Sequence, residues 1–162
     1  MLYASLGVVG LVLMFFGARY AKREYDLGKP TKRWVPLALR GNIPMEEQEN
    51  IAKQINEKIR TDAILRQVVV DVGLQEKFGE PTEDDAVKEL DRRLFVDVGT
   101  ATAPSGLEVP SINIGVSGTG HERAVLDEAS TSLIRHVWIM LGIDPVTGKP
   151  IDRAAPALPG SF

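Results

Sequence analysis

The residues best suited to ligand chemistry form a glycine-rich run, Ser117-Gly118-Thr119-Gly120, between an expected strand and an expected helix. Backbone N–H groups at the start of a helix can bind a phosphate. The run lacks the Gly-Lys-Ser/Thr ending of a P-loop, and its glycines are not spaced as in G-x-G-x-x-G. A flexible turn capped by Ser117 or Thr119 explains the same residues. We favour the turn and keep the four residues as a phosphate-binding candidate.

Histidines and carboxylates in the same expected helix could suggest a metal site. His121 and Glu122 are adjacent, so their side chains would point about 100° apart on a helix. Asp127 lies further along and does not share a face with His121. His136 stands among apolar neighbours, as an ordinary half-buried histidine does. Because a metal site needs ligands that converge, we expect neither a metal nor a cofactor.

The acidic run Glu83-Asp84-Asp85 could support acid–base chemistry. The simpler interpretation places these carboxylates in the first turn of a helix, where the helix dipole favours negative charge. No Ser/His/Asp or Cys/His set can be assembled, and the chain has no cysteine. We therefore expect no catalytic residues and a protein that is not an enzyme. The net charge of −3 argues against nucleic acid as a partner.

The elements that would position these residues follow from hydrophobic periodicity. Leu37 and Leu39 alternate with less apolar residues, which predicts a short strand, and Pro36 restricts it to a sheet edge or a strand start. A helix begins near Pro44, and isoleucines recur along it every four residues. A second helix covers Ala63–Val72, after a cap at Thr61 or Asp62, and stops at Gly73.

The second half of the chain predicts one more helix, a hairpin and a closing helix. Thr82 caps the first of these helices. Phe95–Val98 and Ser111–Val116 then read as the two strands of a hairpin with a long connection. His121–Leu141 is the longest helical pattern, and Gly142 ends it. The predicted fold class is α+β, with a short antiparallel sheet packed by helices over residues 34–143.

Residues 1–18 contain no charged side chain and precede Arg19. As a helix they would span roughly 27 Å, close to the ~30 Å hydrocarbon core of a bilayer. A single transmembrane helix is our prediction, ahead of a cleaved signal peptide or a buried core helix. Gly7, Gly10 and Gly17 would allow another helix to approach closely, although glycine is also simply frequent in membrane helices.

Residues 19–33 form a basic juxtamembrane segment. Its cations would place the following domain in the cytoplasm by the positive-inside rule. Arginines, lysines and aromatic residues here suit the headgroup layer of a lipid bilayer. The predicted interface residues are Arg19, Tyr20, Lys22, Arg23 and Trp34.

Residues 144–162 contain four prolines and cannot form a regular helix or a central strand. They are either a disordered tail or an extended strap laid on a partner. We favour the strap, with Leu158 and Phe162 as its apolar anchors.

The order of elements resembles the membrane-proximal domain of the polysaccharide chain-length determinant (Wzz-like) family over roughly residues 30–141. The resemblance lies in Trp34–Leu39 as a first strand after a span, Asp62–Leu74 as a helix and turn, Asp85–Val96 as a helix and strand, and Ile112–Val116 as a hairpin strand. It implies an extracytoplasmic domain, against the charge count. The family's long helical arm and second span are not found, so the chain would be a reduced form.

These observations lead to three functional expectations. The first is a non-enzymatic, single-pass accessory subunit of a larger bacterial membrane complex, for example respiratory or photosynthetic, which contacts other membrane protein subunits as a homo- or hetero-oligomer. The second is a reduced chain-length determinant in polysaccharide assembly or export. The third is a membrane-tethered regulatory domain that binds a phosphate or a nucleotide. We expect the bacterial inner membrane as the location and lean towards the periplasmic side for the domain.

Overall fold

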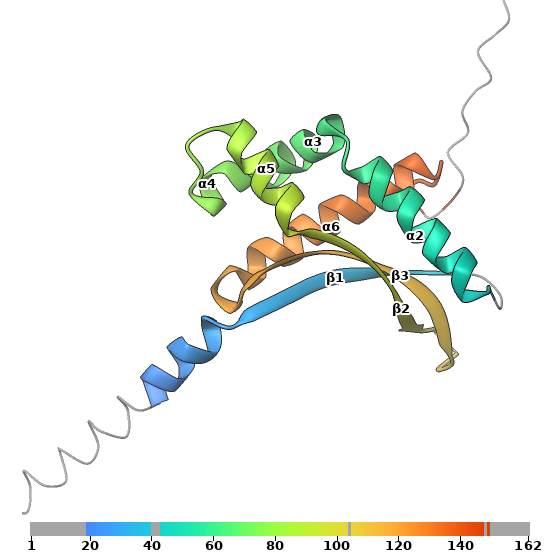
Figure 1. Ribbon diagram of the computed structural model, residues 1–162, viewed down its shortest axis with the longest axis horizontal. Coiled ribbons are helices and arrows are strands. Elements are labelled where there is room, and N and C mark those ends of the chain that lie inside the picture. Colours follow the sequence, from blue (N-terminus) through green and yellow to red (C-terminus); the bar gives the residue numbers. More distant parts are fainter. Residues whose placement is uncertain (1–18, 40–42, 104, 148, 150–162) are drawn as a thin grey trace, which may run out of the picture.

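The computed structural model describes residues 19–39, 43–103, 105–147 and 149. After a helical segment over residues 19–27, the elements are β1 (Pro30–Ala38), α2 (Met45–Ile59), α3 (Asp62–Val72), α4 (Leu74–Phe78), α5 (Glu83–Arg93), β2 (Leu94–Thr102), β3 (Glu108–Thr119), a 3-10 turn η1 (Gly120–Glu122) and α6 (Arg123–Met140). The described part is α+β with a small antiparallel sheet, as expected (Figure 1).

The sheet has three strands in the order β1-β3-β2, so β3 is central and the other two are edge strands. β2 and β3 form the expected hairpin, although both strands run further than their apolar cores. The expected edge position of Pro36 is confirmed, because within the described residues β1 pairs with β3 and with no other strand. β1 begins at Pro30, which pairs with Thr119, and not at Trp34. Residues 30–33 are therefore part of the sheet as well as of the basic segment.

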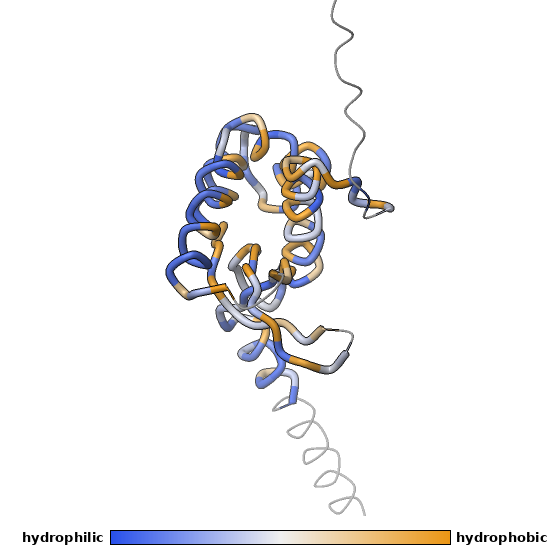
Figure 2. Tube along the Cα trace, turned by 90° about the vertical axis from the view of Figure 1, so that its right-hand side faces the viewer, coloured by the Kyte–Doolittle hydropathy of each residue, from blue (hydrophilic) through white to orange (hydrophobic). Residues whose placement is uncertain are grey.

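The helices cover one face of the sheet, and the core lies between the two layers (Figure 2). Alternate residues of β1 are exposed and half-buried, as in a strand with one covered face. Fully buried residues of the central strand meet fully buried residues of α6. The largest of them are Ile112, Ile114, Val116, Leu126, Leu133 and Val137.

The predicted helix boundaries agree with the local chemistry of their ends. Thr82 Oγ1 accepts a hydrogen bond from the Asp85 N–H at the start of α5. Gly73 and Gly142 end α3 and α6 in the left-handed conformation, with φ of 69° and 75°. The five-residue α4 was not predicted, because so short a helix shows no hydrophobic period. Gly79, with φ of 73°, ends it.

In the described part of the chain, no helix is both long and apolar enough to cross a membrane. The predicted span 1–18, with Gly7, Gly10 and Gly17, lies outside the described residues. The tail anchors Leu158 and Phe162 lie outside them as well. The start of the predicted extended tail is instead a turn, because the Asp144 carboxylate accepts hydrogen bonds from the N–H groups of Val146 and Thr147.

Candidate functional site at the helix–domain junction

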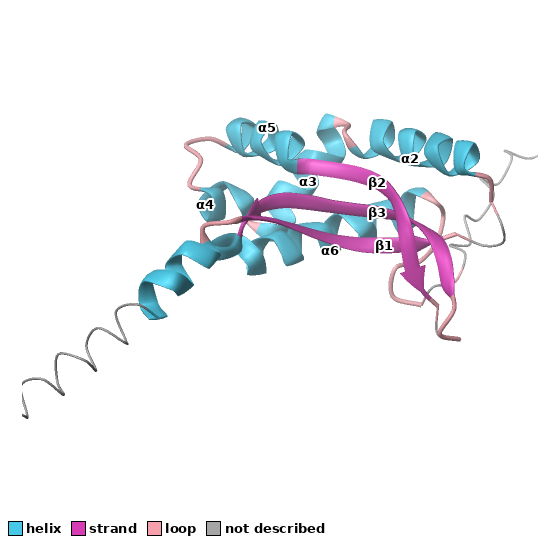
Figure 3. Ribbon diagram, turned by 60° about the horizontal axis from the view of Figure 1, so that its bottom comes forward, coloured by secondary structure: helices cyan, strands magenta, loops and turns pink. Residues whose placement is uncertain are grey.

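The helical segment over residues 19–27 leaves the domain where β1 begins (Figure 3). It carries four of the five predicted interface residues, Arg19, Tyr20, Lys22 and Arg23. All its residues are exposed except Leu27, which is half-buried. Among the described residues, the segment meets the domain through its C-terminal half, and its aromatic and basic side chains are exposed.

The end of this helix rests on Gly120, the first residue of η1. The Gly120 N–H donates to the Lys29 carbonyl over 3.3 Å. A Cβ atom at Gly120 would lie 2.8 Å from the Leu27 carbonyl oxygen and 3.0 Å from Leu27 Cα. Only glycine fits this approach without a shift of backbone. His121 Nε2 adds a contact, 3.7 Å from a Glu24 carboxylate oxygen.

The Glu122 carboxylate accepts hydrogen bonds from within the same loop. One of its oxygens accepts from the Thr119 N–H at 2.8 Å and from Thr119 Oγ1 at 2.9 Å. The first of these bonds is the carboxylate half of a capping box, whose other half joins the Thr119 side chain to the Glu122 N–H. Gly118 leaves room for this oxygen, since a Cβ there would lie 2.8 Å from it. The carboxylate thus occupies the position at the start of the helix that a phosphate would need.

Arg93 joins this loop to α5. Its guanidinium donates to the second Glu122 oxygen at 2.6 Å and to Glu89 at 2.6 Å, and lies 4.5 Å from the centre of the Phe78 ring. Burial lowers the pKa of Arg93, but its hydrogen bonds to Glu122 and Glu89 outweigh burial and raise it above the usual value. Ser117 Oγ donates to the Arg93 carbonyl at 3.0 Å.

The ionised state of Glu89 is also strongly favoured. Its pKa is lowered to about 2, chiefly by the hydrogen bond from Arg92 and next by that from Arg93, against the effect of burial. Burial raises the pKa of Glu122, but the Arg93 and Thr119 hydrogen bonds bring it below its usual value. The four candidate residues 117–120 therefore belong to a charged network that joins their loop to α5. This geometry does not favour the phosphate interpretation.

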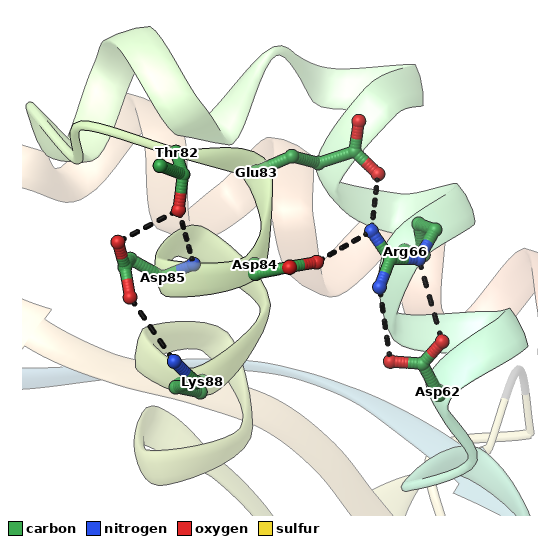
Figure 4. A network of polar contacts seen from close by, with 7 residues as sticks. All are labelled: Asp62, Arg66, Thr82, Glu83, Asp84, Asp85 and Lys88. Carbon is green, nitrogen blue, oxygen red and sulfur yellow. Dashed lines mark hydrogen bonds and ion pairs between the residues drawn. The ribbon is translucent and has the colours of Figure 1, made fainter.

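The acidic run at the start of α5 is a second charged cluster (Figure 4). Arg66 of α3 lies 2.9 Å from Glu83 and 2.8 Å from Asp84, and 3.3 Å from Asp62 on its own helix. Its hydrogen bonds to Glu83, Asp84 and Asp62, in that order of effect, raise the pKa of Arg66. These contacts tie α5 to α3, and the carboxylates lie at the surface.

The histidines and the aspartate considered as metal ligands lie on η1 and α6 and contact different elements. Asp127 pairs with Arg33 of β1 at 3.5 Å, and His136 Nε2 lies 3.4 Å from an Asp71 oxygen of α3. His121 faces the helix over residues 19–27 instead. Within the described residues, no group of three or more His, Cys, Asp or Glu side chains is placed to hold a metal ion.

Trp34 is separated from the other predicted interface residues. It lies on the uncovered face of the sheet, opposite Gly115 of β3, and is half exposed. Phe95 of β2 faces Gly115 from the other side. A Cβ atom at Gly115 would lie 2.0 Å from the Arg33 carbonyl oxygen and 2.7 Å from Trp34 Cα. The close approach of β1 and β3 therefore requires glycine at this position.

Sequence reasoning missed Arg60, which ends α2. Its guanidinium donates to the Asp91 carbonyl at 2.7 Å, to the Asp91 carboxylate at 2.5 Å and to the Leu94 carbonyl at 2.8 Å. A further bond, at 2.9 Å, goes to Asn56. Arg60 thus joins the ends of α2 and α5 to the start of β2. Nothing in the sequence near Arg60 marks this role, because two of its partners are more than thirty positions away.

No known protein family, curated protein or solved structure gives a match to this chain.

Proposed function

We propose that this chain is a non-enzymatic accessory subunit of a larger bacterial membrane complex, with residues 1–18 as its single span. The observation that carries the proposal is the exposed helix over residues 19–27. Helices shorter than about 12 residues are marginal in water when they do not pack on a domain. A helix that continues from the apolar residues 1–18 would supply the missing stability.

The junction gives this helix the properties of a stalk. Gly120 and Lys29 fix its end by backbone contact, and the network of Glu122, Arg93 and Glu89 holds the Gly120 loop on α5. Movement of the anchored helix would be passed to the domain, because Gly28 and Lys29 are the two residues between this helix and β1. A subunit that acts by positioning a domain beside membrane partners needs such a link.

Two signals bear on the side of the membrane that the domain occupies: the positive-inside charge count favours the cytoplasm, and the family resemblance favours the periplasm. Lys32 and Arg33 lie in β1 and face Asp97 and Asp127 of the domain at 3.7 and 3.5 Å. These two cations therefore have a structural role that does not depend on membrane orientation. This weakens the charge argument for the cytoplasm, and we place the domain in the periplasm, as the family resemblance implies.

Membrane fractionation tests the anchor. The full chain should stay in the membrane pellet after carbonate extraction, and a variant that lacks residues 2–18 should be released. Release of the full chain by carbonate would refute the anchor. Protease treatment of spheroplasts tests the side: cleavage of the domain supports the periplasm, and protection contradicts it.

Pull-down of the anchored chain tests its role as a subunit. We expect co-purification of membrane proteins, and Gly10→Leu should weaken it because a bulky side chain prevents close helix approach. A matched Leu11→Val variant should retain its partners. Purification of the chain without any membrane protein, or equal recovery with Gly10→Leu, would contradict helix-mediated assembly.

Spin labels test the stalk. The chain has no cysteine, so labels at Lys22→Cys and Glu57→Cys would be unique. We expect a narrow distance distribution that Gly120→Val broadens, while the distant Gly99→Ala leaves it narrow. A broad distribution in the otherwise unchanged chain would contradict a rigid stalk.

A reduced chain-length determinant is the alternative proposal. The order β1, α2–α5, β2, β3 and α6 supports it, because it matches the element order on which the resemblance rests. Deletion of the gene should then change the length distribution of a surface polysaccharide on a gel. An unchanged length distribution, together with recovery of partners unrelated to glycan export, would contradict this alternative and favour the accessory-subunit proposal.

A further inference from the structure

The two edges of the sheet differ in their ability to pair. The Leu39 N–H donates to the Pro110 carbonyl of β3 at 2.8 Å, so the odd-numbered residues of β1 face β3 and the even-numbered residues face outward. Pro30 and Pro36 therefore present no N–H at the outer edge of β1, with Lys32 between them. Prolines and lysines at an edge prevent the addition of another strand.

The outer edge of β2 lacks the prolines and the lysine found on the edge of β1. The Leu94 carbonyl points away from β3, because it accepts from Arg60 at 2.8 Å. By alternation along the strand, Val96, Val98 and Thr100 also present their N–H and C=O groups outward. β2 contains no proline, and Asp97 is its one charged residue. An edge strand of this kind is a template for a further strand.

A groove follows this edge, between β2 and α2. Its walls come from Val96–Val98 on one side and Glu49, Lys53 and Asn56 on the other. Figure 3 shows α2 running alongside β2. Glu49 and Lys53 lie one helical turn apart, and neither makes an ion pair within the part of the chain that the structure describes.

We infer that a second copy of this chain occupies the groove, with the two β2 strands paired antiparallel about a two-fold axis. The sheet would then continue through both copies as six strands. The two α2 helices would also run antiparallel, so Glu49 of one copy would face Lys53 of the partner subunit, and the same contact would occur twice. This self-complementary charge pattern favours a copy of the chain over an unrelated strand.

Sedimentation of the full chain in detergent tests this dimer. Thr100→Pro should give a monomer with an unchanged circular dichroism spectrum, because the Thr100 N–H faces outward and no internal bond is lost. The matched control is Pro36→Ala on the protected edge of β1, which should stay dimeric. A dimer that persists in Thr100→Pro would refute pairing through β2.

Charge reversal provides a second test that does not touch the strand. Lys53→Glu and Glu49→Lys should each weaken dimerisation by about tenfold, because attraction becomes repulsion at two symmetric contacts. The double variant should restore the dimer. A monomeric unmodified chain, or equal weakening in the single and double variants, would overturn the inference. These outcomes do not depend on whether residues 1–18 anchor the chain.

Discussion

Replacement of Gly115 by alanine should separate β1 from β3. The new Cβ would lie 2.0 Å from the Arg33 carbonyl oxygen, whereas carbon and oxygen atoms normally stay about 3.3 Å apart. The strands must therefore part by about 1.3 Å at this point. The atoms that the new Cβ would meet are the Arg33 carbonyl oxygen and the Cα and Cβ atoms of Trp34. None of these atoms can rotate away, as the end of a flexible side chain could.

The loss of unfolding free energy in Gly115→Ala follows from the interactions that this shift breaks. About two flanking ladder bonds would be lost, at about 1 kcal/mol each. Disturbed packing of Trp34 adds about 1 kcal/mol, so the free energy of unfolding should fall by about 3 kcal/mol in all. With an m-value of about 2 kcal/mol/M, the urea midpoint should drop by about 1.5 M.

Tryptophan fluorescence during urea unfolding measures this effect, because both tryptophans, Trp34 and Trp138, lie in the domain. Gly99→Ala is the matched control on β2. Its Cβ would meet the Asn113 side-chain amide, which can rotate, so we expect a change below about 1 kcal/mol. Equal midpoints for Gly115→Ala and the unmodified chain would refute the argument from close approach.

Substitutions at three further positions test the polar contacts that hold the helices in place. Arg60→Lys should lower the free energy of unfolding by about 2 kcal/mol in urea, because an ammonium cannot reach the same three elements, and a loss below about 0.5 kcal/mol would contradict the clamp. Thr82→Ala should cost about 1 kcal/mol through loss of its cap, and Thr82→Ser should restore it; equal thermal midpoints for both would contradict the cap. Glu89 has a lowered pKa of about 2, so its stabilisation is full above the unfolded value of about 4.3 and is lost as pH falls towards 2. Glu89→Gln should flatten stability between these pH values, and an unchanged acid titration of unfolding would count against the network.

Elements with local signals could be predicted from the sequence. Thr82 followed by three acidic residues marks a helix start, and Gly73 marks a helix end, because capping involves residues a few positions apart. The hairpin was predicted in the same way, from alternation in each strand.

The contacts that join one element to another could not be predicted, because the residues that form each contact are distant in the sequence. Arg93 meets Glu122 twenty-nine positions later, and this contact decides that residues 117–120 serve the fold. The requirement for glycine at position 115 comes from the Arg33 carbonyl of another strand. Neither residue type nor spacing within the glycine-rich run reports these partners.

The strand order has a consequence for the timing of folding. The sheet is β1-β3-β2, so its central strand is the last of the three to leave the ribosome. Until Glu108–Thr119 is synthesised, β1 and β2 lack the strand that pairs with both of them. Pairing β1 with β3 then closes a loop of some seventy residues, a slow step for a small domain. During this interval the outer edge of β1, with its two prolines, is the edge least able to join a neighbouring nascent chain.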